Sequence, residues 1–195
     1  EVYVGCGAAV RRGAFLDAGG YDPGFGYYAE EYDLCARMLL DGWRIAHDRR
    51  FRVTHHKVAG GRDMNIVMRN LVRNNGWVDL RYTPAQFLGA ALRETIDRYA
   101  RIAELEDATL GYEQGLAEMR ATTHEQPART LPTELFDRFT GLAHARATLG
   151  ARLGSERARR VTVVDEGKNA WAVHRAIREL GVELVPVNAI PDALV

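Results

Sequence analysis

The chain has 195 residues, of which 47% are hydrophobic, and its 26 basic residues balance 26 acidic ones. No run approaches the ~18–20 consecutive apolar residues of a membrane-spanning helix, and the formal net charge of zero argues against a protein that binds nucleic acid or an anionic membrane through its overall charge. This length suits one ordinary domain or two small ones.

The start of the chain and its two cysteines bear on where the protein works. The sequence opens at Glu1 without a signal-like run of basic and then apolar residues, so we expect the chain to be part of a longer protein. Cys6 and Cys35 lack the spacing of a metal site. We interpret them as reduced thiols of a cytosolic protein, and a disulfide between them is the open alternative.

The first predicted elements are a strand end and a short helix. Residues 1–4 end the strand, and a run of small residues follows at 5–9. Small side chains let the backbone approach a ligand closely, although a tight strand crossing in a packed sheet accounts for them equally well. An amphipathic helix is predicted over residues 11–18, with Phe15 and Leu16 facing inward.

A glycine-rich run at residues 19–26 precedes an acidic helix, predicted to begin near Ala29 and to end before Gly42. Glu30 and Glu31 fall in its first turn, where the helix dipole stabilises negative charge. Asp33 and Arg37 lie one turn apart and can form an ion pair.

This arrangement has two interpretations. A carboxylate kept charged beside a flexible glycine loop suits a general base. Alternatively, Glu30 and Glu31 only complement the helix dipole, as acidic residues in first turns commonly do.

Two further strands are predicted over residues 43–46 and 51–55, and the second ends in His55. A neutral imidazole at a strand end can bind a divalent cation beside carboxylates supplied from elsewhere. The alternative for His55 is an ordinary polar surface residue.

The rest of the chain changes from a helical to a mixed pattern. Periodicity predicts helices over residues 64–74, 84–103, 112–120 and 134–149, with a linker at 121–132. Apolar, β-branched stretches at 161–164 and 182–187 flank a turn at 165–168 and a helix at 169–180. This βαβ unit resembles the opening of a Rossmann-like domain, without the glycine fingerprint of dinucleotide binding.

Five segments of the first 60 residues occur in an order that resembles the C-terminal half of the catalytic domain of family 2 glycosyltransferases. They are the small-residue run at 5–12, the turn Gly19-Gly20-Tyr21-Asp22, the acidic run at 30–37, the turn Gly42-Trp43 and the strand end Val53-Thr54-His55. Arg69-Asn70-Leu71 also resembles a segment that often follows the histidine in that family.

The resemblance implies an α/β fold with three parts. Residues 1–82 would form the C-terminal half of a GT-A domain, residues 83–156 a helical extension or linker, and residues 157–195 the truncated start of a Rossmann-like domain.

The resemblance also implies an activity: transfer of a sugar, with inversion, from a nucleoside-diphosphate donor to a hydroxyl acceptor, in the synthesis of a cell-surface polysaccharide or glycan. Glu31 would be the catalytic base, with Glu30 as the neighbour that can exchange roles with it, although the family usually has Asp at position 31. The remaining implied site residues would bind or orient the substrate; they are Gly5, Cys6, Gly7, Asp33 and Arg37.

A Mg²⁺ or Mn²⁺ ion at the diphosphate is implied as well, with His55 as one ligand and an Asp-x-Asp motif as the main one. This chain has no such tripeptide, so we expect the nucleotide-binding half upstream of Glu1 and no activity from this fragment alone. The implied location is cytoplasmic, with a peripheral position at the inner membrane face as an alternative. Two other functions stay open, a non-catalytic GT-A-like module that binds a glycan or partner, and a nucleotide-binding module around the C-terminal βαβ unit.

Overall fold

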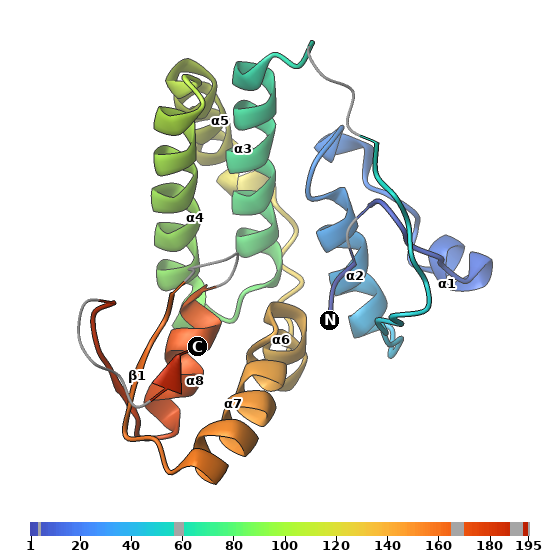
Figure 1. Ribbon diagram of the computed structural model, residues 1–195. Helices are drawn as coiled ribbons and strands as arrows, with labels where there is room; N and C mark the ends of the chain where they lie inside the picture. Colours follow the sequence, from blue (N-terminus) through green and yellow to red (C-terminus); the bar gives the residue numbers. More distant parts are fainter. Residues whose placement is uncertain (4, 57–60, 165–169, 188–192, 195) are drawn as a thin grey trace. The chain divides into compact units, whose positions relative to one another are not determined.

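The computed structural model describes residues 1–3, 5–56, 61–164, 170–187 and 193–194. The chain divides into two compact units, Glu1–Phe136 and Asp137–Val195. Eight α-helices account for most of the described residues (Figure 1). The three-part division by residues 1–82, 83–156 and 157–195 stays a prediction.

Unit 1 begins with two short helices around a small core. Helix α1 is Arg12–Asp17, the 3-10 helix η1 is Pro23–Phe25, and helix α2 is Glu30–Leu40. Ala14 of α1 packs against Leu34 and Met38 of α2, and partly buried aromatic side chains cover this cluster. The predicted acidic helix is thus confirmed, and it ends before Gly42 as expected.

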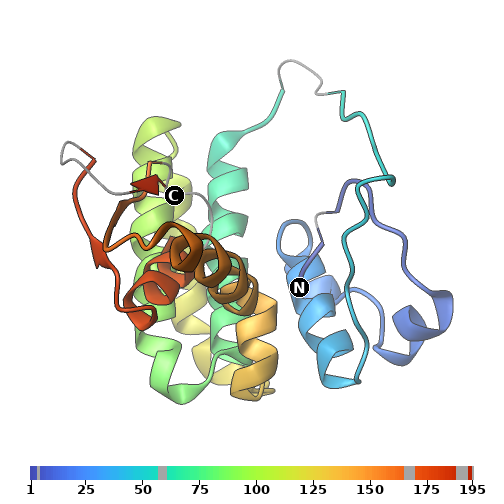
Figure 2. The same ribbon diagram turned by 60° about the horizontal axis from the view of Figure 1, so that its bottom comes forward.

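Three longer helices follow in unit 1. They are α3 (Met64–Tyr82), α4 (Ala85–Leu105) and α5 (Thr109–Ala121), and α3 and α4 lie side by side in both ribbon views (Figures 1 and 2). The side chain of Asp63 caps α3 by accepting hydrogen bonds from the amides of Asn65 and Ile66. The predicted helix at 64–74 therefore begins where expected but continues for eight more residues.

The chain then returns along the end of α3 before it enters unit 2. The 3-10 helix η2 is Thr123–Glu125, and the amides of Arg129 and Leu131 donate to the carbonyls of Arg81 and Tyr82. Helix α6 (Thr133–Thr140) crosses from unit 1 into unit 2. The single helix predicted over 134–149 is two helices, because Gly141, with φ 85°, ends α6 before α7 (Leu142–Glu156) begins.

Unit 2 packs two helices on a small parallel sheet. Its strands are β1 (Arg160–Thr162), β2 (Glu183–Leu184) and β3 (Ala193–Leu194), in the order β2–β1–β3, and helix α8 (Ala170–Glu179) connects β1 to β2. The core combines Leu149 and Leu153 of α7 with Val161 and Ile177. The predicted turn at 165–168 lies outside the described residues.

The expected α/β fold, part GT-A domain and part Rossmann-like domain, is wrong. The predicted strands at 43–46 and 51–55 are extended, but they pair with no other described segment, and the described residues of 1–4 (Val4 is outside them) form no strand either. Strand propensity becomes a strand only where a neighbouring chain supplies hydrogen bonds. The β1–α8–β2 connection is parallel, but described strands of two or three residues do not make a doubly wound sheet.

The α3–α5 contact depends on glycine. A Cβ atom at Gly115 would lie 2.8 Å from the Cα of Arg69 and closer still to that residue's carbonyl oxygen. Backbone atoms of a helix cannot move aside as a flexible side chain can. The two helices therefore approach closely because position 115 has no side chain, and the same holds for Gly111, where a Cβ atom would lie 2.5 Å from the Cα of Asn65.

Replacement of Gly115 by Ala should lower the free energy of unfolding by about 1–3 kcal/mol, because it overpacks this contact. The matched control is Gly89→Ala in α4, where the nearest atom, at 3.6 Å, is the end of the Arg93 side chain. That control should stabilise the protein by roughly 0.5–1 kcal/mol through helix propensity. Urea unfolding followed by circular dichroism measures both, and equal effects of the two variants would contradict the close contact.

Candidate functional site

The acidic helix α2 begins in a strained turn. Tyr28 and Ala29, the two residues before Glu30, have φ values of 75° and 65°, and Ala29 provides no side-chain cap for the helix. Left-handed backbone is costly for a residue with a Cβ atom, by about 1 kcal/mol or more per residue. Two such residues in succession persist only where the surrounding structure holds them.

Asn74 of α3 holds this turn. Its side-chain amide is fully buried and its Nδ2 atom lies 2.9, 3.0 and 2.7 Å from the carbonyl oxygens of Phe25, Tyr27 and Tyr28, to which it donates. The neighbouring Arg73 also reaches the carbonyl of Phe25, at 3.4 Å. A side chain on α3 therefore sets the path of the chain into α2.

Asp33, in the first turn of α2, is a buried charge with partners on two helices. Its Oδ2 accepts hydrogen bonds from Arg37, the nearest at 2.6 Å, and its Oδ1 accepts one from Arg81 at 2.9 Å and one from the Tyr82 hydroxyl at 2.6 Å. The carboxylate is 0% exposed. The Asp33–Arg37 ion pair expected from their spacing is confirmed.

The same arginines fix the glycine turn in front of α2. Arg37 donates to the carbonyls of Ala18 and Gly20, and Arg81 pairs with Asp22 at 2.8 Å. Although burial opposes it, hydrogen bonds from Arg81 and from the Gly24 amide hold the pKa of Asp22 below its usual value. Because these groups are occupied by one another, Asp33 and Arg37 orient the turn and do not face an open pocket.

Glu30 and Glu31 occupy the first two positions of α2 and are partly exposed. Burial, with the negative charge of Glu31 beside it, raises the pKa of Tyr32 to about 12, and the same two causes raise the pKa of the Cys35 thiol to about 12. The carboxylate of Glu31 therefore lies among groups that stay protonated at neutral pH. One oxygen of Glu30, Oε2, is buried and accepts no hydrogen bond from any described residue.

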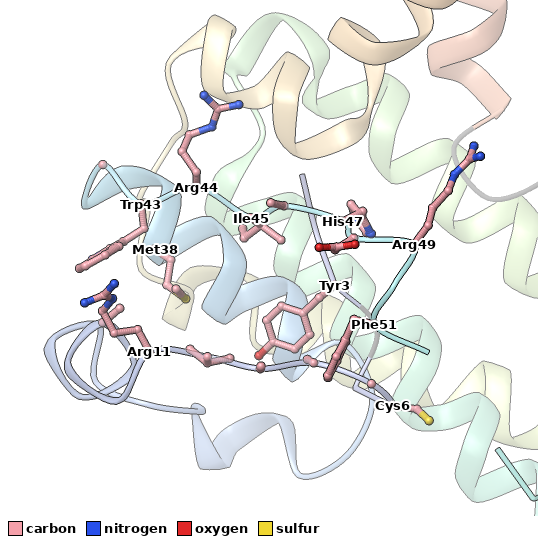
Figure 3. A pocket seen from close by; sticks show the side chains of 18 residues that line it. Tyr3, Cys6, Arg11, Met38, Trp43, Arg44, Ile45, His47, Arg49 and Phe51 are labelled. Atoms are coloured by element: carbon pink, nitrogen blue, oxygen red, sulfur yellow. The ribbon is translucent and has the colours of Figure 1, made fainter. Parts of the chain in front are cut away.

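A pocket of about 850 Å³ lies beside the N-terminal core (Figure 3). Cys6 and Gly7, two of the predicted substrate-binding residues, line it, whereas Gly5 is exposed and does not. Glu30 and Glu31 are not among its lining residues either. The predicted site as a whole therefore stays a prediction, and this pocket includes only its small-residue part.

His55 lies in an exposed, extended segment. Nowhere in the described parts of the chain do three or more His, Cys, Asp or Glu side chains come together as a metal site would require. The described residues alone therefore supply no complete site for the implied Mg²⁺ or Mn²⁺ ion, which stays a prediction, as does His55 as one of its ligands. Both cysteines are free, with Cys6 exposed and Cys35 buried.

The site residues on α3 are not among those predicted from sequence patterns. Asn74, Val78, Arg81 and Tyr82 are all buried and follow the i, i+4, i+7, i+8 spacing of one helix face. The polar residues Asn74 and Arg81 on a helix face that otherwise carries apolar residues could have indicated these positions. The predicted helix, however, ends at residue 74 and does not include Arg81.

Comparisons with protein-family models, with curated proteins and with solved structures found no match for this chain. The site therefore has to be interpreted from its own geometry. Among the described helices, none is long and apolar enough to cross a membrane.

Asn74→Ala should lower the free energy of unfolding by about 1–3 kcal/mol, because it removes a buried donor shared by the carbonyls of Phe25, Tyr27 and Tyr28, of which the Phe25 carbonyl keeps other donors. The neighbouring Asn75 donates only to the carbonyl of Leu71 on its own helix, so Asn75→Ala is the matched control and should change stability by less than about 0.5 kcal/mol. Urea titration compares the two. If both variants lost the same unfolding free energy, the special role of Asn74 in this turn would be contradicted.

Asp33→Asn should lower the free energy of unfolding by about 3–5 kcal/mol. It removes the charged partner of buried Arg37 and one of the two charged partners of buried Arg81. Asp41→Asn, the same substitution at the exposed C-terminal end of α2, should leave stability nearly unchanged. Thermal unfolding of both variants tests this, and an Asp33→Asn protein as stable as Asp41→Asn would rule out the buried charge as a stabilising element.

Proposed function

We propose that this chain contributes the acceptor side of an inverting sugar transferase, which moves a sugar from a nucleoside-diphosphate donor to a hydroxyl acceptor with Glu31 as general base. The observation that carries the proposal is the strained pair Tyr28 and Ala29 directly before Glu30 and Glu31. Adjacent left-handed residues that a buried side chain holds in place are found where geometry matters more than stability. The order of the five sequence segments that resemble family 2 glycosyltransferases, one of which is this acidic run, is the second support.

The position of Glu31 suits proton abstraction. Its carboxylate is at the positive end of a helix, which stabilises the ionised form needed before the reaction. The side chain is partly exposed, so an acceptor hydroxyl can reach it, while Tyr32 and Cys35 keep their own protons and do not compete as bases.

In the proposed reaction, Glu31 takes the proton of the acceptor hydroxyl as that oxygen forms a bond to the anomeric carbon. The bond from this carbon to the diphosphate breaks at the same time, and the nucleoside diphosphate leaves with the bonding electrons. Inversion follows because attack and departure take place on opposite faces of the sugar. Asp33 and Arg37 act before the chemistry, by holding the glycine turn and the first turn of α2 together.

The proposal assigns no step to a metal ion, because the described residues hold no site for one. Binding of the donor diphosphate is likewise left to groups that this part of the chain does not supply. The activity should therefore be measured on the protein as its gene encodes it.

Glu31→Gln in the gene-encoded protein should lower turnover by more than about tenfold, because general-base catalysis contributes at least that much. Donor affinity should stay nearly unchanged, since glutamine has the same shape and Glu31 faces the acceptor. The assay is release of nucleoside diphosphate from a panel of uridine, guanosine and thymidine diphosphate sugars, with simple glycosides as acceptors.

Glu113→Gln, at an exposed position of α5, is the matched control and should retain full turnover. Parental turnover in Glu31→Gln would refute the base assignment alone. Failure of the unsubstituted protein to release nucleoside diphosphate from any donor would refute the transferase proposal, and would favour a non-catalytic binding module.

A further inference from the structure

The pocket beside the N-terminal core has two dissimilar walls. The first wall is the run of mostly small residues from Cys6 to Val10. The second wall is the segment from Trp43 to Asp48. Figure 3 shows the side chains of Tyr3, Ile45 and Phe51 between these walls. Ala14 and Met38, which belong to the buried core, also line the pocket.

The middle of the pocket is therefore apolar, and it is open to solvent. Phe51 is 55% exposed although it is a large aromatic residue, and Tyr3, Trp43 and Ile45 are only partly buried. A volume of about 850 Å³ lies within the range of small-molecule sites. Exposed aromatic surface that lines such a pocket is the part of a site that holds the body of a ligand.

The charges around the pocket do not cancel. Its lining includes three arginines, Arg11, Arg44 and Arg49, but only one acidic residue, Asp48. Glu1 neutralises Arg44 at 2.6 Å, and Arg50 neutralises Asp48 at 2.7 Å.

Arg11 and Arg49 form no ion pair with any residue that the structure describes. In Figure 3, Arg49 extends away from the pocket, whereas Arg11 lies beside Trp43. The guanidinium carbon of Arg11 is 5.9 Å from the centroid of the Trp43 ring. This contact holds a positive charge at the edge of the apolar surface, and its guanidinium donates to no residue that the structure describes.

We propose that this pocket binds a small amphipathic anion, that is, a carboxylate or phosphate ester with a short alkyl or aryl body. The body would lie among Tyr3, Ile45 and Phe51, and the anionic group would accept hydrogen bonds from Arg11 beside Trp43. A cation would be repelled at this position, and a neutral ligand would leave Arg11 without a partner. The inference goes beyond the proposed function, because binding here requires neither Glu31 nor any transfer step.

The test is a titration of the ¹⁵N-labelled chain with octanoate and with octyl phosphate, each below its micelle concentration. The chain has three tryptophans, whose indole N–H signals report separately on three places. The Trp43 signal should shift and saturate, whereas Trp77, whose indole donates to Thr122 at 2.9 Å, and Trp171 of unit 2 should stay in place. Octanol, which has the same chain length without the charge, should shift Trp43 only weakly.

Arg11→Gln should weaken the binding of both anions by about tenfold or more, as expected for a lost hydrogen bond to a charged group. Arg12→Gln is the matched control, because Arg12 is exposed like Arg11 but does not line the pocket. Unchanged Trp77 and Trp171 signals in both variants would show that the fold is intact.

Saturable binding of either anion that Arg11→Gln weakens and Arg12→Gln does not would support the proposal. It would be overturned if Trp43 did not shift with either anion, if octanol bound as tightly as octanoate, or if the two variants behaved alike. None of these outcomes depends on sugar transfer, so a failure here is distinct from a failure of the proposed function.

Discussion

The buried carboxylate of Asp33 constrains the relation between α2 and the longer helices of unit 1. Its two oxygens accept from Arg37 on the same helix and from Arg81 and Tyr82 at the end of α3. A charge without solvent is tolerated only where several donors surround it, and here two arginines and a tyrosine hydroxyl do so. The register of α2 against α3 is therefore fixed by hydrogen bonds with defined directions, which apolar packing alone would not supply.

The turn before α2 is held from α3 as well. The chain enters α2 through the left-handed residues Tyr28 and Ala29, and the side-chain amide of Asn74 shares its two hydrogens among three carbonyls of this turn. The anchors Asn74 and Arg81 lie on one face of α3, two turns apart. One helix, α3, thus holds both the turn before α2 and the first turn of α2. A general base at Glu31 would need this preorganisation.

Tyr3 connects two chemically different regions, the apolar pocket and the turn before α2. Tyr3 lines the pocket, and its hydroxyl lies 2.9 Å from that of Tyr21, next to the glycine turn. Burial raises the pKa of Tyr3, and the charge of Glu31 adds to this shift, so the phenol lies within electrostatic reach of the acidic helix.

The sequence by itself determined the local features. The limits of α2, the Asp33–Arg37 pair and the parallel β1–α8–β2 connection all follow from spacing within one or two neighbouring elements. It did not determine the fold class, because segments 43–46 and 51–55 have strand-like composition, but a strand also requires a partner chain, which only the tertiary structure supplies or withholds. The same holds for the site: Arg81 reaches Asp33 across 48 residues of sequence, and no local periodicity relates two positions so far apart. Contacts of that kind are set by how helices pack, and only the folded chain decides them.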